Sequence, residues 1–253
     1  MKFKFIDILL FSLLFIFVIA FPVNLLGLDL FYQTLLSIGL KVLLLAYYIY
    51  ILCRYHINIF KFANYRRALL FIPFLLACFS NIIALKISGV AFYFRYDPAL
   101  LSLFCINALL VAINEELLFR LFIQNSLIFA SSIKRVLASA GIFALFHLLA
   151  MVNISSLQAL TEVATQVVYA FGLGLILGLL YEYTYSLPLC IFFHLSFNIF
   201  NSVLIEKVYG FEPTNQYILS FYVTAVVIGV LLVGYGLFLY FFILKRNERY
   251  FKE

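Results

Sequence analysis

Residues 99–120 read ALLSLFCINALLVAINEELLFR, an apolar run of membrane-spanning length that ends in two adjacent carboxylates and an arginine. About 20 apolar residues are enough for a helix to cross the hydrocarbon core of a bilayer. An ionisable side chain inside such a run costs about 3 kcal/mol or more, so Glu115, Glu116 and Arg120 indicate a functional site. The stretch therefore predicts a membrane helix and also the position of its chemistry.

The composition extends this interpretation to the whole chain. Of the 253 residues, 66% are hydrophobic and only 11% are charged, which excludes an ordinary water-soluble domain. The apolar runs are unbroken, whereas a membrane β-barrel shows short segments of alternating polarity. We therefore expect an all-α polytopic membrane protein of about eight transmembrane helices with a catalytic core of four. The expected crossings are residues 5–26, 31–53, 68–86, 99–120, 136–153, 160–182, 187–204 and 217–244.

Three regions follow from these crossings. Residues 1–98 hold the first three helices, residues 99–204 hold the four-helix core, and residues 205–253 hold the last helix and a tail. Of the 17 Lys and Arg residues, 13 fall in segments that lie on one side if the N-terminus is cytoplasmic, and three fall on the other side. The positive-inside rule then predicts that both termini are cytoplasmic. The high content of Phe, Ile, Tyr and Asn favours a low-GC bacterial source, and hence the bacterial plasma membrane.

The net charge of +6 does not indicate a nucleic-acid partner, because the basic residues are scattered between apolar runs. The four cysteines show neither metal-type nor disulfide spacing and are interpreted as packing residues. Two lone charges lie inside crossings, Asp7 in the first and Lys41 in the second. Snorkelling or pairing within the bundle explains most such cases.

Two further short patterns carry chemically capable groups. Phe143 precedes His147 by four residues in the fifth crossing, and His194 precedes Asn198 by four in the seventh. A four-residue step puts two side chains on one helix face. At about 1.5 Å per residue, the histidines, Asn198 and Glu115 can all meet in the cytoplasmic half of the bilayer.

The two glutamates are expected to have different roles. Glu116 and Arg120 lie one turn apart and can neutralise each other, while Glu115 points about 100° away around the helix. A carboxylate that faces imidazole in a desolvated cavity activates water, and a histidine or amide stabilises the developing oxyanion. No serine or cysteine lies in a comparable pattern, so water-mediated hydrolysis fits better than acyl-enzyme chemistry. Each pair taken alone is also compatible with a purely structural role.

Taken together, the three patterns resemble the motifs of the CPBP family, the CAAX-protease and bacteriocin-processing (Abi) group of intramembrane proteases. The resemblance covers about residues 99–204, including the glycine-rich run 172–182. It implies that Glu115 is the general base, assisted by His147, and that His194 and Asn198 form the oxyanion site. It implies further that Glu116 and Arg120 hold the architecture and that Phe143 packs beside the site.

A metal is a separate question. Glu115, His147 and His194 match a zinc site with an open position for water, and the family is often labelled metalloprotease. The same residues also work without metal, and no HExxH pattern demands zinc. The preferred interpretation requires no cofactor, and zinc stays an alternative.

The sequence therefore predicts a hydrolase, an intramembrane endopeptidase that cleaves a membrane-embedded or lipidated protein or peptide. Candidate substrates are a prenylated CAAX-type tail, a bacteriocin or leader peptide, and a pro-peptide. The alternative is a non-catalytic protein that gives bacteriocin self-immunity or regulates a membrane partner by helix contact. A proton-coupled transporter is disfavoured because the chain shows no repeat. A polar stripe, Glu162, Gln166 and Tyr169, is expected to face the bundle interior and either lines a substrate path or joins helices.

Overall fold

The computed structural model describes residues 5–21, 23–59, 65–89, 93–94, 97–127, 131–149, 157–201, 203, 209–210 and 215–244. In this part of the chain the long elements are all helices. Two-residue strands, β1 (Tyr93–Phe94) and β2 (Tyr209–Gly210), pair antiparallel. The predicted all-α polytopic class is confirmed.

The helices that precede the motif residues in the chain are α1 (Phe5–Ala20), η1 (Val23–Leu26), α2 (Leu30–Arg54), α3 (Tyr65–Ala68), η2 (Leu69–Phe79) and α4 (Ser80–Ser88). The remaining ones are α5 (Pro98–Glu116), η3 (Leu117–Gln124), α6 (Ser132–Phe146), α7 (Leu157–Thr184), α8 (Leu187–Asn198), α9 (Asn215–Phe238) and η6 (Leu239–Leu244). Six continuous helices within the described residues are long and apolar enough to cross a membrane, and two shorter apolar helices cover Ile6–Ile19 and Leu187–Asn201.

The helix ends differ from the expected crossings in three places. The first helix ends at Ala20 rather than near residue 26, since a proline follows two residues later in the sequence and the residue before a proline disfavours helix. The fourth helix continues past Arg120 to Gln124, and α6 begins at Ser132, before the predicted residue 136. Residues 22, 150–153, 202 and 204 of the predicted crossings lie outside the described residues.

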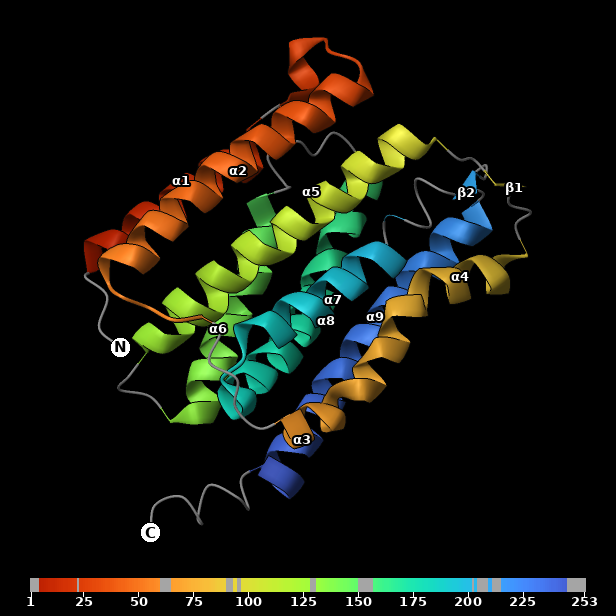
Figure 1. The fold of residues 1–253 in the computed structure, drawn as a ribbon. Helices are drawn as coiled ribbons and strands as arrows, with labels where there is room; N and C mark the ends of the chain where they lie inside the picture. The colour runs from red at the N-terminus through yellow and green to blue at the C-terminus, as the bar shows by residue number, and fades with distance from the viewer. Residues whose placement is uncertain are drawn as a thin grey trace.

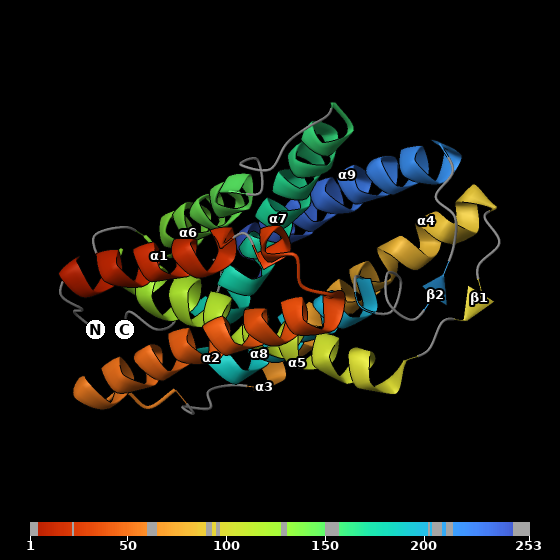
Figure 2. The same cartoon turned by 90° about the horizontal axis from the view of Figure 1, so that it is seen from above.

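Figure 1 shows the helices side by side in one elongated bundle. Helix α7 packs against α6, α8 and α9, and α5 packs against α2 and α8. Helix α1 lies beside α2, and α4 lies beside α9. The view from above in Figure 2 shows α9 running beside α7, and α4 beside α9. Helix α7 is the most buried of the candidate spans. The motif residues therefore lie on α5, η3, α8 and the C-terminal end of α6, and η3, α6 and α8 pack directly against α7.

Close contacts of α7 with its neighbours depend on glycine. A Cβ atom on Gly172 would lie 2.8 Å from the carbonyl oxygen of Gly229 in α9. A Cβ atom on Gly174 would lie 3.1 Å from the Cα atom of Ala140 in α6. Small residues allow helix backbones to approach closely in a membrane, where van der Waals packing drives association.

The outer surface is apolar, as a lipid-facing surface must be. Large apolar side chains are strongly exposed on α2, η2 and α9, for example Leu43 (69%), Leu76 (72%) and Val230 (61%). In water such a surface would drive aggregation. The protein is therefore a multi-pass membrane protein; the cytoplasmic orientation of its termini stays a prediction.

Candidate active site

The two helices that carry the acidic and the second histidine motif have well-defined starts. In α5, the Asp97 carboxylate accepts hydrogen bonds from the backbone N–H groups of Ala99 and Leu100, at 3.0 and 3.2 Å. In α8, the Ser186 hydroxyl accepts one from Leu189 N–H at 3.4 Å. Each cap is followed by a proline in the first helical turn. Such caps satisfy N–H groups that have no partner in the helix and fix where it begins.

The two glutamates lie where the α-helix changes its winding. Glu116 is the last residue of α5, and Leu117–Gln124 continues as a wider π-helix whose residues are all buried. Wide turns of this type often occur at functional sites. The sequence-based prediction assumed ordinary α-helical winding throughout and did not anticipate this change.

Glu116 is fully buried, and two partners neutralise it. Its Oε2 atom lies 2.9 Å from Nε of Arg120, which is also fully buried. Its Oε1 atom lies 2.8 Å from Nδ1 of His194 in α8. A buried charge is stable only when it is paired and hydrogen-bonded. The expected pairing of Glu116 with Arg120 is present, and the contact with His194 adds a link to α8.

Arg120 also has partners on α6. One guanidinium nitrogen donates to the Ser139 hydroxyl at 3.2 Å, and that hydroxyl donates to the Phe119 carbonyl at 2.9 Å. The guanidinium carbon lies 5.4 Å from the centroid of the Phe143 ring, within the range of a cation–π contact. Arg120 therefore connects the acidic motif to the helix that carries Phe143 and His147.

His194 lies between both carboxylates. Its Nδ1 atom contacts Glu116, as described above, and its Nε2 atom lies 3.5 Å from Oε2 of Glu115. Glu115 is 8% exposed, and His194 is 2% exposed. A ring protonated on both nitrogens would direct a donor at each carboxylate. His194 is thus the residue that joins the buried ion pair to Glu115.

His147 directly follows α6, at its C-terminal end. Its Nδ1 atom lies 2.9 Å from the Phe143 carbonyl oxygen. Because a carbonyl only accepts, Nδ1 carries the proton, and the Nε2 atom of a neutral ring keeps its lone pair. The last carbonyl groups of a helix lack intrahelical partners and are free to accept side-chain donors. The bond also fixes the orientation of the His147 ring. The Phe143 ring contacts both imidazoles, with centroid distances of 4.9 Å to His147 and 6.0 Å to His194.

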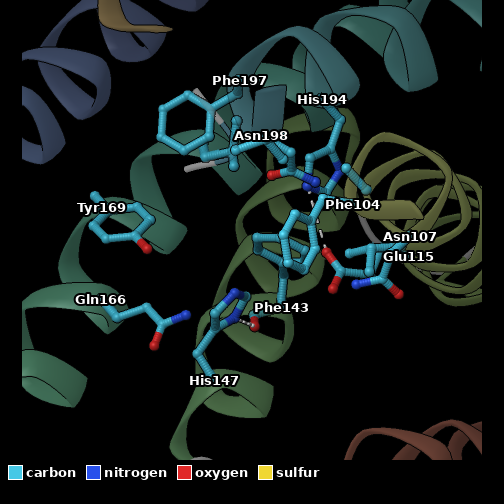
Figure 3. Close-up of a pocket in the computed structure, with 14 residues that line it drawn as sticks. Phe104, Asn107, Glu115, Phe143, His147, Gln166, Tyr169, His194, Phe197 and Asn198 are labelled. Carbon is cyan, nitrogen blue, oxygen red and sulfur yellow. Dashed lines mark hydrogen bonds and ion pairs between the residues drawn. The ribbon is translucent and has the colours of Figure 1, made fainter. Parts of the chain in front are cut away.

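These groups face one cavity of about 320 Å³ (Figure 3). Its wall is formed by Phe104, Asn107, Ala108, Val111, Glu115, Phe143, His147, Gln166, Tyr169, Leu173, His194, Phe197, Asn198 and Val203. In Figure 3, Glu115 lies on the α5 side, while Gln166 and Tyr169 lie across the cavity on α7. The cavity therefore combines a carboxylate, two imidazoles and amide groups with apolar walls, as enzyme sites commonly do.

The structure brings most of the predicted site residues together. Glu115, His147, His194, Asn198 and Phe143 line the cavity. Glu116 and Arg120 do not line it and lie buried behind His194.

The predicted polar stripe on α7 divides between two environments. Gln166 and Tyr169 line the cavity. Glu162 instead accepts a hydrogen bond from the Tyr222 hydroxyl of α9 at 3.3 Å. One end of the stripe therefore joins helices, and the other end faces the cavity.

The lone charges of the first two crossings are hydrogen-bonded to neutral hydroxyl groups. Asp7 accepts a hydrogen bond from the Tyr55 hydroxyl, and the Lys41 ammonium group donates to the Ser37 hydroxyl. The backbone carbonyl of Lys41 also accepts a hydrogen bond from Asn114 at 3.2 Å. Asp7 is therefore bonded across the bundle to a neutral hydroxyl, whereas the Lys41 side-chain contact lies within its own helix.

Sequence reasoning missed two polar residues of this region. Ser139 supports Arg120, and Asn107 lines the cavity on the same helix as Glu115. Only for Asn107 could the spacing in the sequence have predicted a place at the site. Asn107 precedes Glu115 by eight residues, which is close to two helical turns and therefore the same face, whereas the contact of Ser139 depends on how α6 packs.

A metal ion at this site would need several converging ligands. Within the described residues, no three His, Cys, Asp or Glu side chains converge in a way that could hold a metal ion. His194 turns one nitrogen to Glu116 and the other toward Glu115, and Nδ1 of His147 is bonded to a carbonyl. Metal-ligating histidines commonly bond their second nitrogen to a carbonyl or carboxylate in the same way, so these contacts do not decide against zinc, which stays an alternative to the metal-free interpretation.

The fold and the cavity define a class of protein, a multi-pass membrane protein with a buried carboxylate and imidazole site. Residues 97–200 match the family model of the Rce1-like type II CAAX prenyl endopeptidases. No curated protein and no solved structure matches the chain. This segment is thus similar to the CAAX-protease family, and the resemblance inferred from the motifs is confirmed. That family supports intramembrane endopeptidase activity in general.

Proposed function

We propose that the protein hydrolyses a peptide bond of a membrane-associated protein or peptide with water activated by Glu115. The observation that carries the proposal is the approach of Glu115 and His194 to within 3.5 Å on the wall of a cavity that also contains His147 and Asn198. A general base and oxyanion donors directed at one space are what acyl transfer to water requires.

The first step forms a tetrahedral intermediate. The Glu115 carboxylate takes a proton from water, and the water oxygen bonds to the scissile carbonyl carbon. The negative charge moves to the carbonyl oxygen, where the Nε2–H group of His194 and the amide N–H of Asn198 donate hydrogen bonds. His147, with its free Nε2 lone pair, orients the water from the α6 side.

The second step breaks the carbon–nitrogen bond. The intermediate collapses as the protonated Glu115 carboxyl returns its proton to the leaving amine, which restores the carboxylate. The reaction therefore consumes one water molecule and leaves a new carboxyl group and a new amine, which ionise to a carboxylate and an ammonium group. Removal of a positioned general base typically slows such reactions about 10²–10⁴-fold.

The ion pair behind the site has a separate task in this proposal. Glu116 binds Nδ1 of His194 and is itself neutralised by Arg120. This arrangement fixes the orientation of the imidazole so that Nε2 faces Glu115 and the cavity. Glu116 and Arg120 are thus positioning residues, and Phe143 packs against both imidazole rings and the Arg120 guanidinium group.

The substrate is membrane-associated, since the cavity lies within a bundle with an apolar outer surface. A prenylated CAAX-type tail, a bacteriocin or leader peptide and a pro-peptide all belong to this class. The proposed location is the bacterial plasma membrane. The mechanism needs no metal.

The test compares newly formed protein termini in membranes of the native host carrying the original protein or Glu115→Gln at matched levels. Glu162→Gln is the matched control, because it makes the same chemical change on α7 at an exposed carboxylate bonded to Tyr222. Termini that require Glu115 but not Glu162 support the proposal and identify the substrate. If all three profiles agree, hydrolysis is refuted, and a non-catalytic immunity or regulatory role takes its place.

A further inference from the structure

Asn198, the proposed oxyanion donor, lies where α8 changes its winding. Helix α8 ends at this residue, and residues 199–201 continue with the wider turn of a π-helix. Asn198 is half-buried and lines the cavity (Figure 3). A hydrogen-bond donor stabilises an oxyanion best when it is held in place before the charge develops. The contacts that hold this end of α8 therefore bear on the proposed reaction.

A cluster of three buried polar residues holds the end of α8 against α4. Ser80 and Asn81 lie in the first turn of α4, and Asn201 lies three residues after Asn198; the three are at most 8% exposed. The Ser80 hydroxyl and the Asn81 backbone N–H both donate to the Asn201 side-chain oxygen, at 2.7 and 3.1 Å. The Asn81 side-chain amide donates to the Asn201 backbone carbonyl at 2.5 Å. Helix α4 thus binds both the side chain and the backbone of Asn201.

The bond to the backbone carbonyl distinguishes this cluster from ordinary helix packing. Polar side chains commonly join membrane helices by bonding to one another, as the Ser80 hydroxyl does here. The Asn81 side chain instead bonds to the main chain of the wide turn that follows α8. Wide turns of this type often occur at functional sites. Helix α4 therefore fixes the path of the backbone beside Asn198.

Asn198 lies between two anchored residues of one continuous helix. Four residues before it, His194 is bonded to the buried Glu116 at 2.8 Å. Three residues after it, Asn201 is bonded to α4. The described wall of the cavity includes Asn198 and His194 but none of the three residues of the cluster. Any effect of the cluster on a substrate in the cavity therefore passes through the backbone of α8.

We propose that Ser80 and Asn81 are positioning residues for Asn198. They fix Asn201, and thereby the wide turn from which the Asn198 amide faces the cavity. This proposal rests on the proposed function for the role of Asn198 as an oxyanion donor. It gives α4, which precedes the segment matched by the family model, a part in the reaction.

Steady-state kinetics separate positioning from packing. With an identified substrate, Asn81→Leu should lower kcat about 10–100-fold and leave KM unchanged, because a displaced donor loses stabilisation of the transition state alone. Ser80→Ala removes one bond only and should lower kcat less, and Ser80→Thr, which keeps the hydroxyl, should restore it. Ser88→Ala is the matched control on α4, since the buried Ser88 hydroxyl donates to the Leu85 carbonyl of the same helix at 2.8 Å. It should leave kcat unchanged.

A double-mutant cycle shows whether the effect passes through Asn198. Added to Asn198→Ala, Asn81→Leu should lower kcat no further, since the group that it positions is already absent. Equal losses of kcat in the two backgrounds would overturn the proposal. An Asn81→Leu protein that is less stable in SDS titration but keeps its kcat would overturn it too. If Asn81→Leu does not fold, Ser80→Ala takes its place in the same cycle.

A spectroscopic measurement separates this proposal from the proposed function. The full chain is labelled with ¹⁵N-asparagine in lipid nanodiscs, and the side-chain amide signal of Asn198 is identified by its loss in Asn198→Ala. Ser80→Ala should shift this signal, and Ser88→Ala should not. If the signal shifts but no peptide is cut, the positioning of Asn198 by α4 stands and hydrolysis is refuted. If cleavage requires Glu115 while Ser80→Ala changes neither the signal nor kcat, hydrolysis stands and the positioning is refuted.

Discussion

Removal of the Arg120 charge should destabilise the protein more than removal of both charges of its ion pair. Both side chains are fully buried, with Nε of Arg120 2.9 Å from Glu116. Arg120→Met leaves the Glu116 carboxylate without its main counter-ion in a low-dielectric interior. Breaking a buried pair on one side costs about 3–5 kcal/mol, whereas replacing both partners by neutral groups of similar volume is often close to neutral.

The structure adds a second, separable consequence. Glu116 also holds Nδ1 of His194, so the double variant Glu116→Gln/Arg120→Met should recover stability but not activity. The assay is unfolding in mixed micelles with increasing SDS, followed by helicity and run beside cleavage of an identified substrate. A single variant as stable as the original protein would refute the reasoning, as would a double variant that loses the sum of the two single losses.

Three further predictions follow from particular contacts. Asn198→Ala should reduce kcat about 10²–10³-fold with little change in KM or in unfolding, because one oxyanion donor is lost; an increase in KM alone would contradict this role. Gly172→Ala should destabilise by about 1–3 kcal/mol, since the new Cβ would meet the Gly229 carbonyl oxygen at 2.8 Å. Gly39→Ala, which would meet nothing within 4 Å, is the control and should not destabilise in SDS titration. Prolonged dialysis against a chelator should leave the cleavage rate unchanged, whereas a loss that zinc restores would refute the metal-free mechanism.

Much of the fold could be predicted because a bilayer restricts the choice of structure. A chain in lipid must satisfy its backbone hydrogen bonds internally, so long apolar runs become helices, and their number and order can be read from the sequence. Helix ends were less predictable. The extension past Arg120 to Gln124 was missed because its residues pack against other helices, which sequence periodicity does not record.

The identity of the cavity residues was also largely predictable, and their pairing was not. Helical spacing predicted that Glu116 pairs with Arg120 and that Glu115 points away from this pair, and the structure has both features. It did not reveal that His194 contacts both glutamates, because that contact depends on how α8 packs on α5. The same limit explains why Gln166 and Glu162, equivalent in the sequence pattern, lie in different environments.

The central claim is that Glu115 activates water at the cavity wall. It is tested most directly with the reconstituted protein and a peptide that spans an identified cleavage site, in water enriched in ¹⁸O. We expect one ¹⁸O atom in the new carboxylate, a rate about 10²–10⁴-fold lower for Glu115→Gln, and no change for Glu162→Gln. A Glu115→Gln protein that is folded and cleaves the peptide at the original rate would contradict the account.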